Sequence, residues 1–238
     1  CHLATGNYNV RTGGTYADLG LFTCRESFGE DLTELFNLLT GYTRPRGFQH
    51  LAVAPTSLRD GLVSRIRREA EHARAGRPAR IIGKMNSLVD RHLIEELYKA
   101  SAAGVQIHLI VRGICCLRPG VPGLSDRIRA ISIIDRYLEH ARVYYFQNGS
   151  DPDYLLASAD WMPRNLDNRV EVTFPILEPA LQRQIRDMLE IQLADTAKAR
   201  LIRPDGRSER VTATILPPLR SQELLYELAN GAGIYPSA

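Results

Sequence analysis

Between residues 48 and 116 the chain alternates short apolar runs with helix-like stretches, and this alternation restricts the folds open to it. The runs at 51–54, 80–85 and 105–111 are rich in Ile, Val, Leu or Ala and are typical of strands. Between them, apolar residues recur every three or four positions until glycine breaks the pattern. Alternating strands and helices predict an α/β domain in which helices flank a parallel sheet.

The rest of the chain continues with strands and then helices. Strands are predicted at residues 142–146, 154–158 and 169–174. A long amphipathic helix begins at Pro179, and a shorter one is predicted near residues 221–230. The predicted fold class is therefore α/β, a layered domain with a mixed, mainly parallel sheet flanked by helices.

The 238 residues are enough for one large domain, or for one domain and part of another. No apolar run is long enough to predict a membrane-spanning helix. The net charge of +3 is too small to indicate a nucleic-acid partner. Only three of the 30 basic residues are lysines, and arginine binds phosphate in a bidentate way. This excess of arginine fits a polyanionic partner, and it fits codon bias in a GC-rich genome equally well.

The four cysteines are Cys1, Cys24, Cys115 and Cys116, and none belongs to a Cys-x-x-Cys pair. This pattern is unlike that of a disulfide-stabilised secreted protein and favours a reduced, cytoplasmic setting. The chain opens on Cys1, within a motif-like stretch and without a signal segment. We therefore expect it to be a piece of a longer protein.

Standard catalytic motifs are missing from the sequence. Gly83-Lys84 lacks the upstream glycine and the following hydroxyl residue of a P-loop, and no G-x-G-x-x-G, H-E-x-x-H or G-x-S-x-G motif occurs. The six histidines are scattered, so no metal site is predicted within this chain. A nucleotide would have to be held in another way.

His140 and Arg142 stand two residues apart at the start of a predicted strand. Residues i and i+2 of a strand point to the same face, so an imidazole and a guanidinium would project together. Such a pair suits phosphate chemistry, because histidine can transfer a proton or act as nucleophile while arginine holds oxygens. The alternative interpretation is a surface histidine at a strand edge.

Other candidates lie where predicted strands end. Arg112 ends the strand at 105–111, ahead of a glycine-rich loop, and Lys84 and Asn86 mark the end of the strand at 80–85. Ligands of open α/β sheets bind at this edge, so these side chains are predicted to face an anionic ligand. Arg112 could instead pair with a nearby carboxylate. His2 precedes the small residues Thr5–Asn7, which let backbone approach an anion, but it could also belong to a frayed end.

Longer motifs follow one another in a fixed order along the chain. They are His2-x-x-Thr5-Gly6-Asn7-Tyr8-Asn9, Thr15-Tyr16-Ala17-Asp18, Lys84-x-Asn86-Ser87-Leu88-Val89-Asp90, Val111-Arg112-Gly113-Ile114-Cys115, Ser125-Asp126-x-Ile128-Arg129-Ala130-Ile131-Ser132, Asp135-Arg136-Tyr137-Leu138-Glu139-His140-Ala141-Arg142-Val143-Tyr144 and Ser158-Ala159-Asp160-Trp161-Met162-x-Arg164-Asn165. Together they resemble the C-terminal part of bacterial polyphosphate kinases of the long, histidine-phosphorylated type. The resemblance extends to about Arg200.

The resemblance implies two phospholipase D-like catalytic domains, with residues 1–45 as the tail of the first and 46–238 as the second with C-terminal helices. It implies reversible transfer of the terminal phosphate of ATP to inorganic polyphosphate through a phosphohistidine, with ATP, ADP and polyphosphate as ligands. The phosphorylated histidine and the residues that contact Mg²⁺ are expected upstream of this chain, in domains of the same polypeptide. A homo-oligomer is also expected, with no nucleic acid bound, and association with a membrane surface is left open.

The resemblance also implies roles for individual residues. Tyr16, Arg112 and His140 match nucleotide-binding residues of the family, and Arg142, Lys84 and Asn86 are expected to contact ATP or phosphate. His140 corresponds to a histidine that assists transfer as acid or base. His2 matches a second histidine important for activity.

At two positions the sequence differs from the pattern of a phospholipase D. Arg142 stands where a phospholipase D has lysine, and Gln147 stands where its aspartate would fall.

A phospholipase D-type phosphodiesterase or nuclease is one alternative function, and a non-catalytic polyphosphate-binding piece is another. We expect that the isolated chain does not phosphorylate itself.

Overall fold

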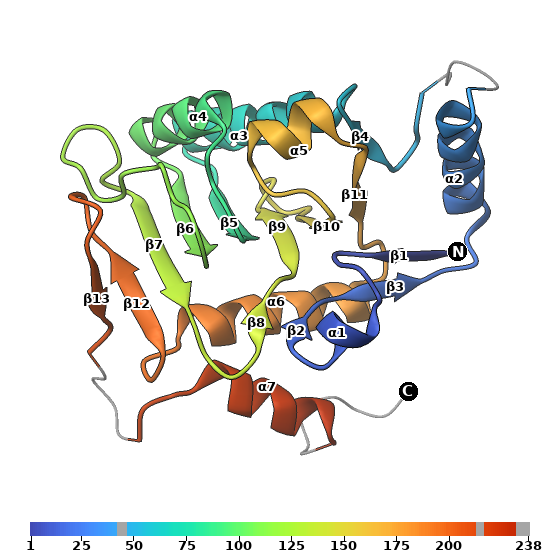
Figure 1. Ribbon diagram of the computed structural model, residues 1–238. Helices are drawn as coiled ribbons and strands as arrows, with labels where there is room; N and C mark the ends of the chain where they lie inside the picture. Colours follow the sequence, from blue (N-terminus) through green and yellow to red (C-terminus); the bar gives the residue numbers. More distant parts are fainter. Residues whose placement is uncertain (42–46, 213–216, 232–238) are drawn as a thin grey trace.

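The computed structural model describes residues 1–41, 47–212 and 217–231, and a nine-stranded sheet forms its centre (Figure 1). The strands lie in the order β13-β12-β7-β6-β5-β9-β10-β11-β4. Their bounds are β4 (Ala52–Ala54), β5 (Arg80–Met85), β6 (Gln106–Val111), β7 (Ile128–Ile133), β9 (Arg142–Phe146), β10 (Asp153–Ala157), β11 (Glu171–Pro175), β12 (Ala199–Ile202) and β13 (Ser208–Arg210).

The α/β class with a mixed sheet is confirmed, but the pairing differs from the mainly parallel sheet that was predicted. Within the nine-stranded sheet, as far as the structure describes it, only β5, β6 and β7 pair in parallel, and the other six neighbouring pairs are antiparallel. The predicted first strand, β4, is separated from β5 by β9, β10 and β11. The connection from β9 to β10 is too short for a parallel crossover, so these two strands pair antiparallel, and β10 pairs antiparallel with β11 as well.

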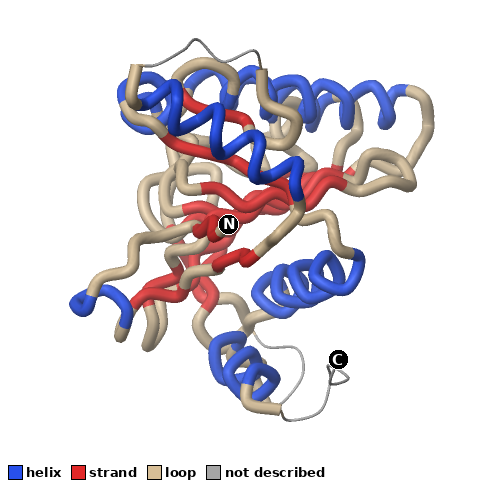
Figure 2. Tube along the Cα trace, turned by 90° about the vertical axis from the view of Figure 1, so that its right-hand side faces the viewer, coloured by secondary structure: helices blue, strands red, loops and turns tan. Residues whose placement is uncertain are grey.

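Helices cover both faces of the sheet (Figure 2). On one face lie α3 (Leu58–Arg74), α4 (Arg91–Ala102) and α5 (Pro163–Asn168), and on the other lie α6 (Pro179–Leu193) and α7 (Ser221–Ala229). Neighbouring residues of β5 enter different cores, since Ile81 packs in the cluster that contains α3 and α4 and Ile82 in the cluster that contains α6. Both faces of the sheet are therefore apolar, and each fully buried aliphatic side chain contributes about 1.5–3 kcal/mol.

The N-terminal segment packs against the sheet as a small layer of its own. It consists of β1 (His2–Ala4), α1 (Val10–Gly13), β2 (Tyr16–Ala17), β3 (Gly20–Phe22) and α2 (Glu26–Leu39). β1 pairs with β3 as an antiparallel hairpin. β2 pairs in parallel with β8 (Leu138–Glu139), a short strand just ahead of β9. The segment around residue 16 therefore lies beside the segment around residue 138.

Asp31 joins helix α2 to the chain that enters β4. Its side chain is buried, and its carboxylate accepts hydrogen bonds from the backbone N–H groups of Gln49, His50 and Leu51, at 2.7–2.9 Å. The predicted boundary between residues 45 and 46 falls outside the described residues.

Replacement of Asp31 with alanine is expected to lower the free energy of unfolding by about 2 kcal/mol, because buried N–H groups lose their acceptor. Thermal and urea unfolding followed by circular dichroism measure the change. Glu30→Ala, an exposed change on the same helix, is the control and should leave stability nearly unaltered. Equal stability of the two variants would contradict this role for Asp31.

Candidate active site

The pairing of β2 with β8 places His140 against Asp18. The Nδ1 atom of His140 lies 2.9 Å from both carboxylate oxygens of Asp18. Because an ionised carboxylate only accepts hydrogen bonds, Nδ1 carries the hydrogen, and the Nε2 atom of a neutral ring is left with its lone pair. The ring of Tyr16 lies 4.8 Å from that of His140. The predicted residues Tyr16 and His140 are thus brought together.

Asp18 is held by a second donor, the Oγ1 hydroxyl of Thr5, at 2.8 Å. Burial alone would raise the pKa of Asp18, but hydrogen bonds from His140 and Thr5 and the nearby charges of His140 and Arg142 lower it overall. Gly6 follows Thr5, and a Cβ atom there would overlap the Asp18 carboxylate. The turn at Gly6 therefore depends on glycine.

Arg142 lies on the same side as His140, as its two-residue spacing predicts. Its Nη1 atom donates to the carbonyl of Thr5 at 2.8 Å and lies 3.3 Å from Nδ1 of His140. Its Nη2 and Nε atoms meet the carboxylate of Asp160 at 3.0 and 3.3 Å. Both side chains of this ion pair are buried, so the guanidinium is fixed in place and Asp160 balances its charge.

Asn86 connects Arg112 to the same cluster. The Oδ1 atom of Asn86 accepts from Nε and Nη2 of Arg112 at 3.0 and 2.7 Å, and its Nδ2 atom donates to the carbonyl of His140 at 3.2 Å. Arg112 also donates to the carbonyl of Glu139 at 3.2 Å. The acceptors of Arg112 are uncharged, so its positive charge stays available to a ligand.

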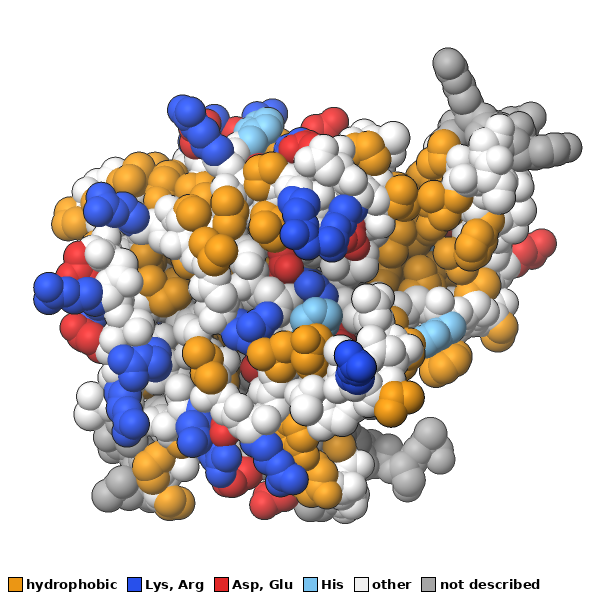
Figure 3. Space-filling view, in the orientation of Figure 1, with side chains coloured by type: hydrophobic (Ala, Val, Ile, Leu, Met, Phe, Trp, Pro, Cys, Tyr) orange, Lys and Arg blue, Asp and Glu red, His pale blue; other side chains and the backbone are white. Residues whose placement is uncertain are grey.

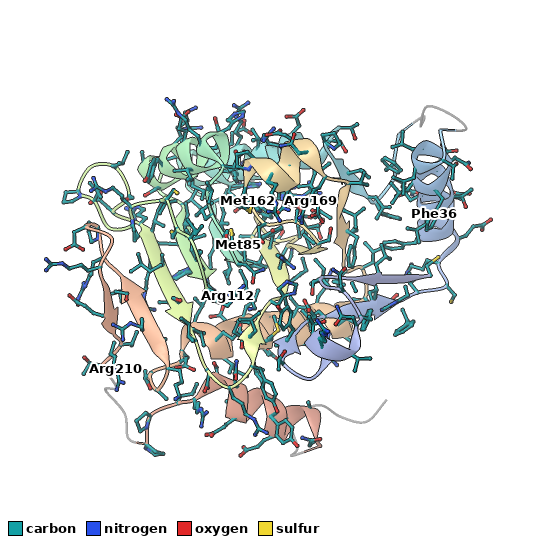
Figure 4. The ribbon with its side chains drawn as sticks, viewed as in Figure 1. Phe36, Met85, Arg112, Met162, Arg169 and Arg210 are labelled. Carbon is teal, nitrogen blue, oxygen red and sulfur yellow. The ribbon has the colours of Figure 1, made fainter. Side chains whose placement is uncertain are left out.

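A cavity of about 550 Å³ opens in front of His140 and Arg142. Its walls come from residues 4–7, from the end of β10 and from the segment around α5. Arg164 and Arg169 line it with exposed side chains. In Figure 4, Met162 and Arg169 lie beside α5, with Arg112 further down the same face. Basic side chains and histidine gather in the middle of this face (Figure 3). The cavity thus suits an anionic ligand.

A second cavity, of about 530 Å³, has Arg112 in its lining, which the cavity in front of His140 does not. It is formed by the loop after β6 and by the hairpin of β12 and β13. Three more arginines line it, namely Arg118, Arg200 and Arg203, together with the cysteines Cys115 and Cys116. Burial raises the pKa of the Cys115 thiol to about 11, so that thiol stays protonated at neutral pH.

Two predicted residues do not join the cluster. Lys84 is buried on the α6 side of the sheet, where its Nζ atom lies 2.8 Å from the carboxylate of Glu139. His2 is exposed on β1, stacks on Phe22 with ring centroids 4.2 Å apart, and lies 3.2 Å from the hydroxyl of Tyr8. Neither residue lines the cavity in front of His140.

Sequence reasoning missed Asp18 and Asp160, the two carboxylates that hold His140 and Arg142. Both occur in the motifs that carried the family resemblance, which was the available signal. No local spacing could pair Asp18 with His140, because 122 positions separate them.

No group of three or more His, Cys, Asp and Glu side chains in the described residues could hold a metal ion. Within the same residues, no helix is both long and apolar enough to cross a membrane.

Fold and site together define an α/β domain with a histidine- and arginine-lined cavity that suits an anionic ligand, and comparison with known proteins identifies its family. The family model "Polyphosphate kinase C-terminal domain 2" matches residues 51–222, and "Polyphosphate kinase C-terminal domain 1" matches residues 1–45. The chain belongs to the polyphosphate kinase family.

Similar proteins agree with this assignment. The polyphosphate kinase of Thermosynechococcus vestitus is 58% identical over 205 residues, which are 86% of this chain and 28% of that protein. Polyphosphate kinase 1 of Chlorobaculum tepidum is 53% identical over 222 residues, 93% of this chain and 32% of that protein. The crystal structure of polyphosphate kinase from Porphyromonas gingivalis matches with a TM-score of 0.93 and 41% identity, covering 97% of this chain and 36% of the other. The chain thus spans about a third of the length of its relatives.

Replacement of Asp18 with asparagine is expected to destabilise the fold above about pH 4, where the Asp18 carboxylate is ionised in the folded and unfolded chain. Because folding lowers its pKa, the stabilisation is present above the unfolded pKa and is lost as pH falls through the folded pKa. The difference in unfolding free energy between wild type and Asp18→Asn should therefore shrink toward pH 3. Urea unfolding at a series of pH values measures it, with the exposed Asp151→Asn as control. A difference independent of pH would contradict the charge-based role.

Proposed function

We propose that this chain forms the nucleotide and phosphate part of a polyphosphate kinase active site. The reaction is the reversible transfer of the terminal phosphate of ATP to inorganic polyphosphate. Membership of the family supports the reaction, and the cluster formed by the hydrogen-bonded pair of Asp18 and His140 with Arg142 beside it supports the location. The observation that carries the proposal is the contact between Nδ1 of His140 and Asp18, because it directs Nε2 away from the protein toward a ligand.

Each residue has a distinct task in this proposal. Tyr16, which is 38% exposed beside His140, offers a ring face on which the adenine can stack. Arg112 stabilises charge on the phosphate oxygens, and Arg142, held by Asp160, contributes as a hydrogen-bond donor to them. Phosphoryl transfer needs positioning and positive charge more than covalent chemistry from the protein, and this cluster supplies both.

The nucleophile in this proposal is a histidine outside this chain. Its ring nitrogen forms a bond to the γ-phosphorus while the bond from that phosphorus to the β–γ bridging oxygen breaks, and ADP leaves with the bridging oxygen. In the doubly protonated form of His140, with Nδ1–H on Asp18, the Nε2–H group donates a hydrogen bond to the leaving oxygen and can transfer its proton to it, which leaves the ring neutral. In the second step a terminal oxygen of polyphosphate attacks the same phosphorus and restores the histidine.

Mg²⁺ is expected to accompany ATP and would offset phosphate charge. The described residues contain no group of three or more His, Cys, Asp and Glu side chains that could bind Mg²⁺, so we do not assign the ion to this part of the chain. No step assigned to this chain depends on the metal.

The second arginine-lined cavity gives the polyphosphate chain a path away from the transfer site. Arg112 lines this cavity and is bonded to Asn86, which in turn holds the main chain of His140. We propose that polyphosphate leads from Arg112 toward Arg118 and Arg200. Arginines spaced along a groove suit a chain of repeated anionic groups.

We also propose a cytoplasmic location and a homo-oligomeric assembly. Free cysteines support the location, since Cys1, Cys24, Cys115 and Cys116 form no disulfide in the described chain. Association with a membrane surface stays a prediction, as does the assembly.

Replacement of His140 or Arg112 with alanine in the full-length polypeptide is expected to reduce ATP-dependent polyphosphate synthesis by more than tenfold. A charged contact made in the transition state is worth about that much. The control is His92→Ala, which removes a half-exposed histidine on α4. Near-normal rates in both site variants would overturn the proposal, and cleavage of bis-p-nitrophenyl phosphate by the wild type would favour a phosphodiesterase instead.

The location of the phosphorylated histidine is tested with ATP labelled at the γ-phosphate. The full-length polypeptide is expected to become labelled, whereas this chain alone is not. Acid-labile label on the isolated chain, lost in His140→Ala or His2→Ala, would place the nucleophile here and contradict the assignment.

Replacement of both Arg118 and Arg200 with alanine is expected to raise the KM for polyphosphate at least fivefold and to change the KM for ATP less than twofold. Loss of two charges weakens binding of a long anion most at low salt. Steady-state kinetics at two ionic strengths measure the effect, and Arg91→Ala, a nearly fully exposed change on α4, is the control. Equal changes in the two KM values would contradict a separate polyphosphate path.

A further inference from the structure

We propose that Gln222, on helix α7, is a positioning residue for His140. The proposal rests on the proposed function only for its kinetic part, because the positioning itself is a statement about the folded chain. Gln222 hydrogen-bonds to the edge of the segment 137–140 opposite the edge that pairs with β2, and its hydrogen bonds in the described chain go to Tyr137 and Glu139. It acts through the main chain and through Glu139.

Glu139 precedes His140 and points the other way, as neighbouring residues of an extended strand do. Its buried carboxylate is met by three donors from three elements. Nζ of Lys84 on β5 and Nε2 of Gln192 on α6 each lie 2.8 Å from Oε2, and Nε2 of Gln222 lies 2.7 Å from Oε1. Lys84 balances the negative charge of Glu139, and the two amide groups donate further hydrogen bonds to its carboxylate.

Gln222 also bonds to the main chain of Tyr137 in both directions. Its Oε1 atom accepts from the N–H of Tyr137 at 2.9 Å, and its Nε2 atom donates to the carbonyl of Tyr137 at 2.8 Å. With the bond to Glu139, both hydrogens of the amide group are used. The buried side chain therefore has one fitting orientation, and it pairs with the chain as a neighbouring strand would.

The segment 137–140 is consequently held at both edges. One edge pairs with β2, through the N–H of Leu138 to the carbonyl of Thr15 and the N–H of His140 to the carbonyl of Ala17. The other edge pairs with Gln222. Asp18, which orients the His140 ring, follows directly after Ala17 on β2. Movement of the segment away from Gln222 would shift the His140 ring relative to Asp18.

Helix α7 is itself fixed at its N-terminal end. Arg220 forms a two-bonded ion pair with Asp135, at 2.7 and 2.8 Å. Asp195 accepts from both the N–H and the hydroxyl of Ser221, at 2.8 and 2.7 Å. Gln222 is the next residue, so these contacts transmit the position of α7 to the segment that carries His140.

The test replaces Gln222 with methionine in the full-length polypeptide. Methionine keeps the length and most of the packing of glutamine but cannot bond to Tyr137 or Glu139. Gln222→Ala serves as a second variant, and Glu227→Ala, an exposed change on the same helix, is the control. Thermal unfolding establishes which variants are folded at the assay temperature.

Two readouts decide the proposal. The first is the rate at which diethyl pyrocarbonate modifies His140, measured by peptide mass spectrometry relative to the half-exposed His92. We expect this ratio to change at least threefold in Gln222→Met and to stay constant in Glu227→Ala. An unchanged ratio in folded Gln222→Met and Gln222→Ala would overturn the positioning role. This readout needs no enzymatic activity, so it stands even if the proposed function fails.

The second readout is a double-mutant cycle on ATP-dependent synthesis. Gln222→Met is expected to lower kcat at least fivefold with little change in the KM for ATP, and to have no further effect in the His140→Ala background. Full additivity of the two substitutions would show that Gln222 does not act through His140 and would overturn the proposal. Absence of synthesis in the wild type would instead count against the proposed function alone.

Discussion

The short parallel contact between β2 and β8 determines where the polar groups of the site lie. The N–H groups of His140 and Ala141 both donate to the carbonyl of Ala17. Asp18 follows Ala17 and therefore meets the His140 ring. Since the two segments are far apart in sequence, closing this contact costs loop entropy, and the packing of the β1–β3 hairpin and α2 helps to offset that cost. The geometry of His140 thus depends on the packing of the whole N-terminal segment.

Two buried ion pairs, on opposite sides of this contact, give the site its charge distribution. Arg142 pairs with Asp160 on the cavity side, and Lys84 pairs with Glu139 on the α6 side. Buried pairs of this kind add little net stability, but loss of one partner is costly, so they favour a single arrangement. Because both cations are already balanced, the field acting on an anionic ligand comes mainly from Arg112 and from the exposed arginines around the cavities.

The sequence predicted the strands β5 and β6, the helices α3 and α4 that precede them and the place of Arg112 at a strand end, because apolar runs and strand ends are local signals. It did not predict β7, β12 or β13, whose pairing depends on distant partners. Lys84 was predicted to face the ligand, but its side chain lies outside the cluster around His140. Lys84 shares its side of β5 with Ile82, which packs in the α6 core, so the side chain points away from the cavity.

The site also lies where two family domains meet. Asp18, Thr5 and Tyr16 belong to the segment that matches the first C-terminal domain, whereas His140 and Arg142 belong to the segment that matches the second. Neither segment alone orients His140, because the ring needs Asp18 and the main chain needs both β2 and α7. A site assembled in this way can be altered by any change in how the two segments pack. The contacts that hold α2, β2 and α7 therefore determine the geometry of His140 as much as the side chains next to its ring do.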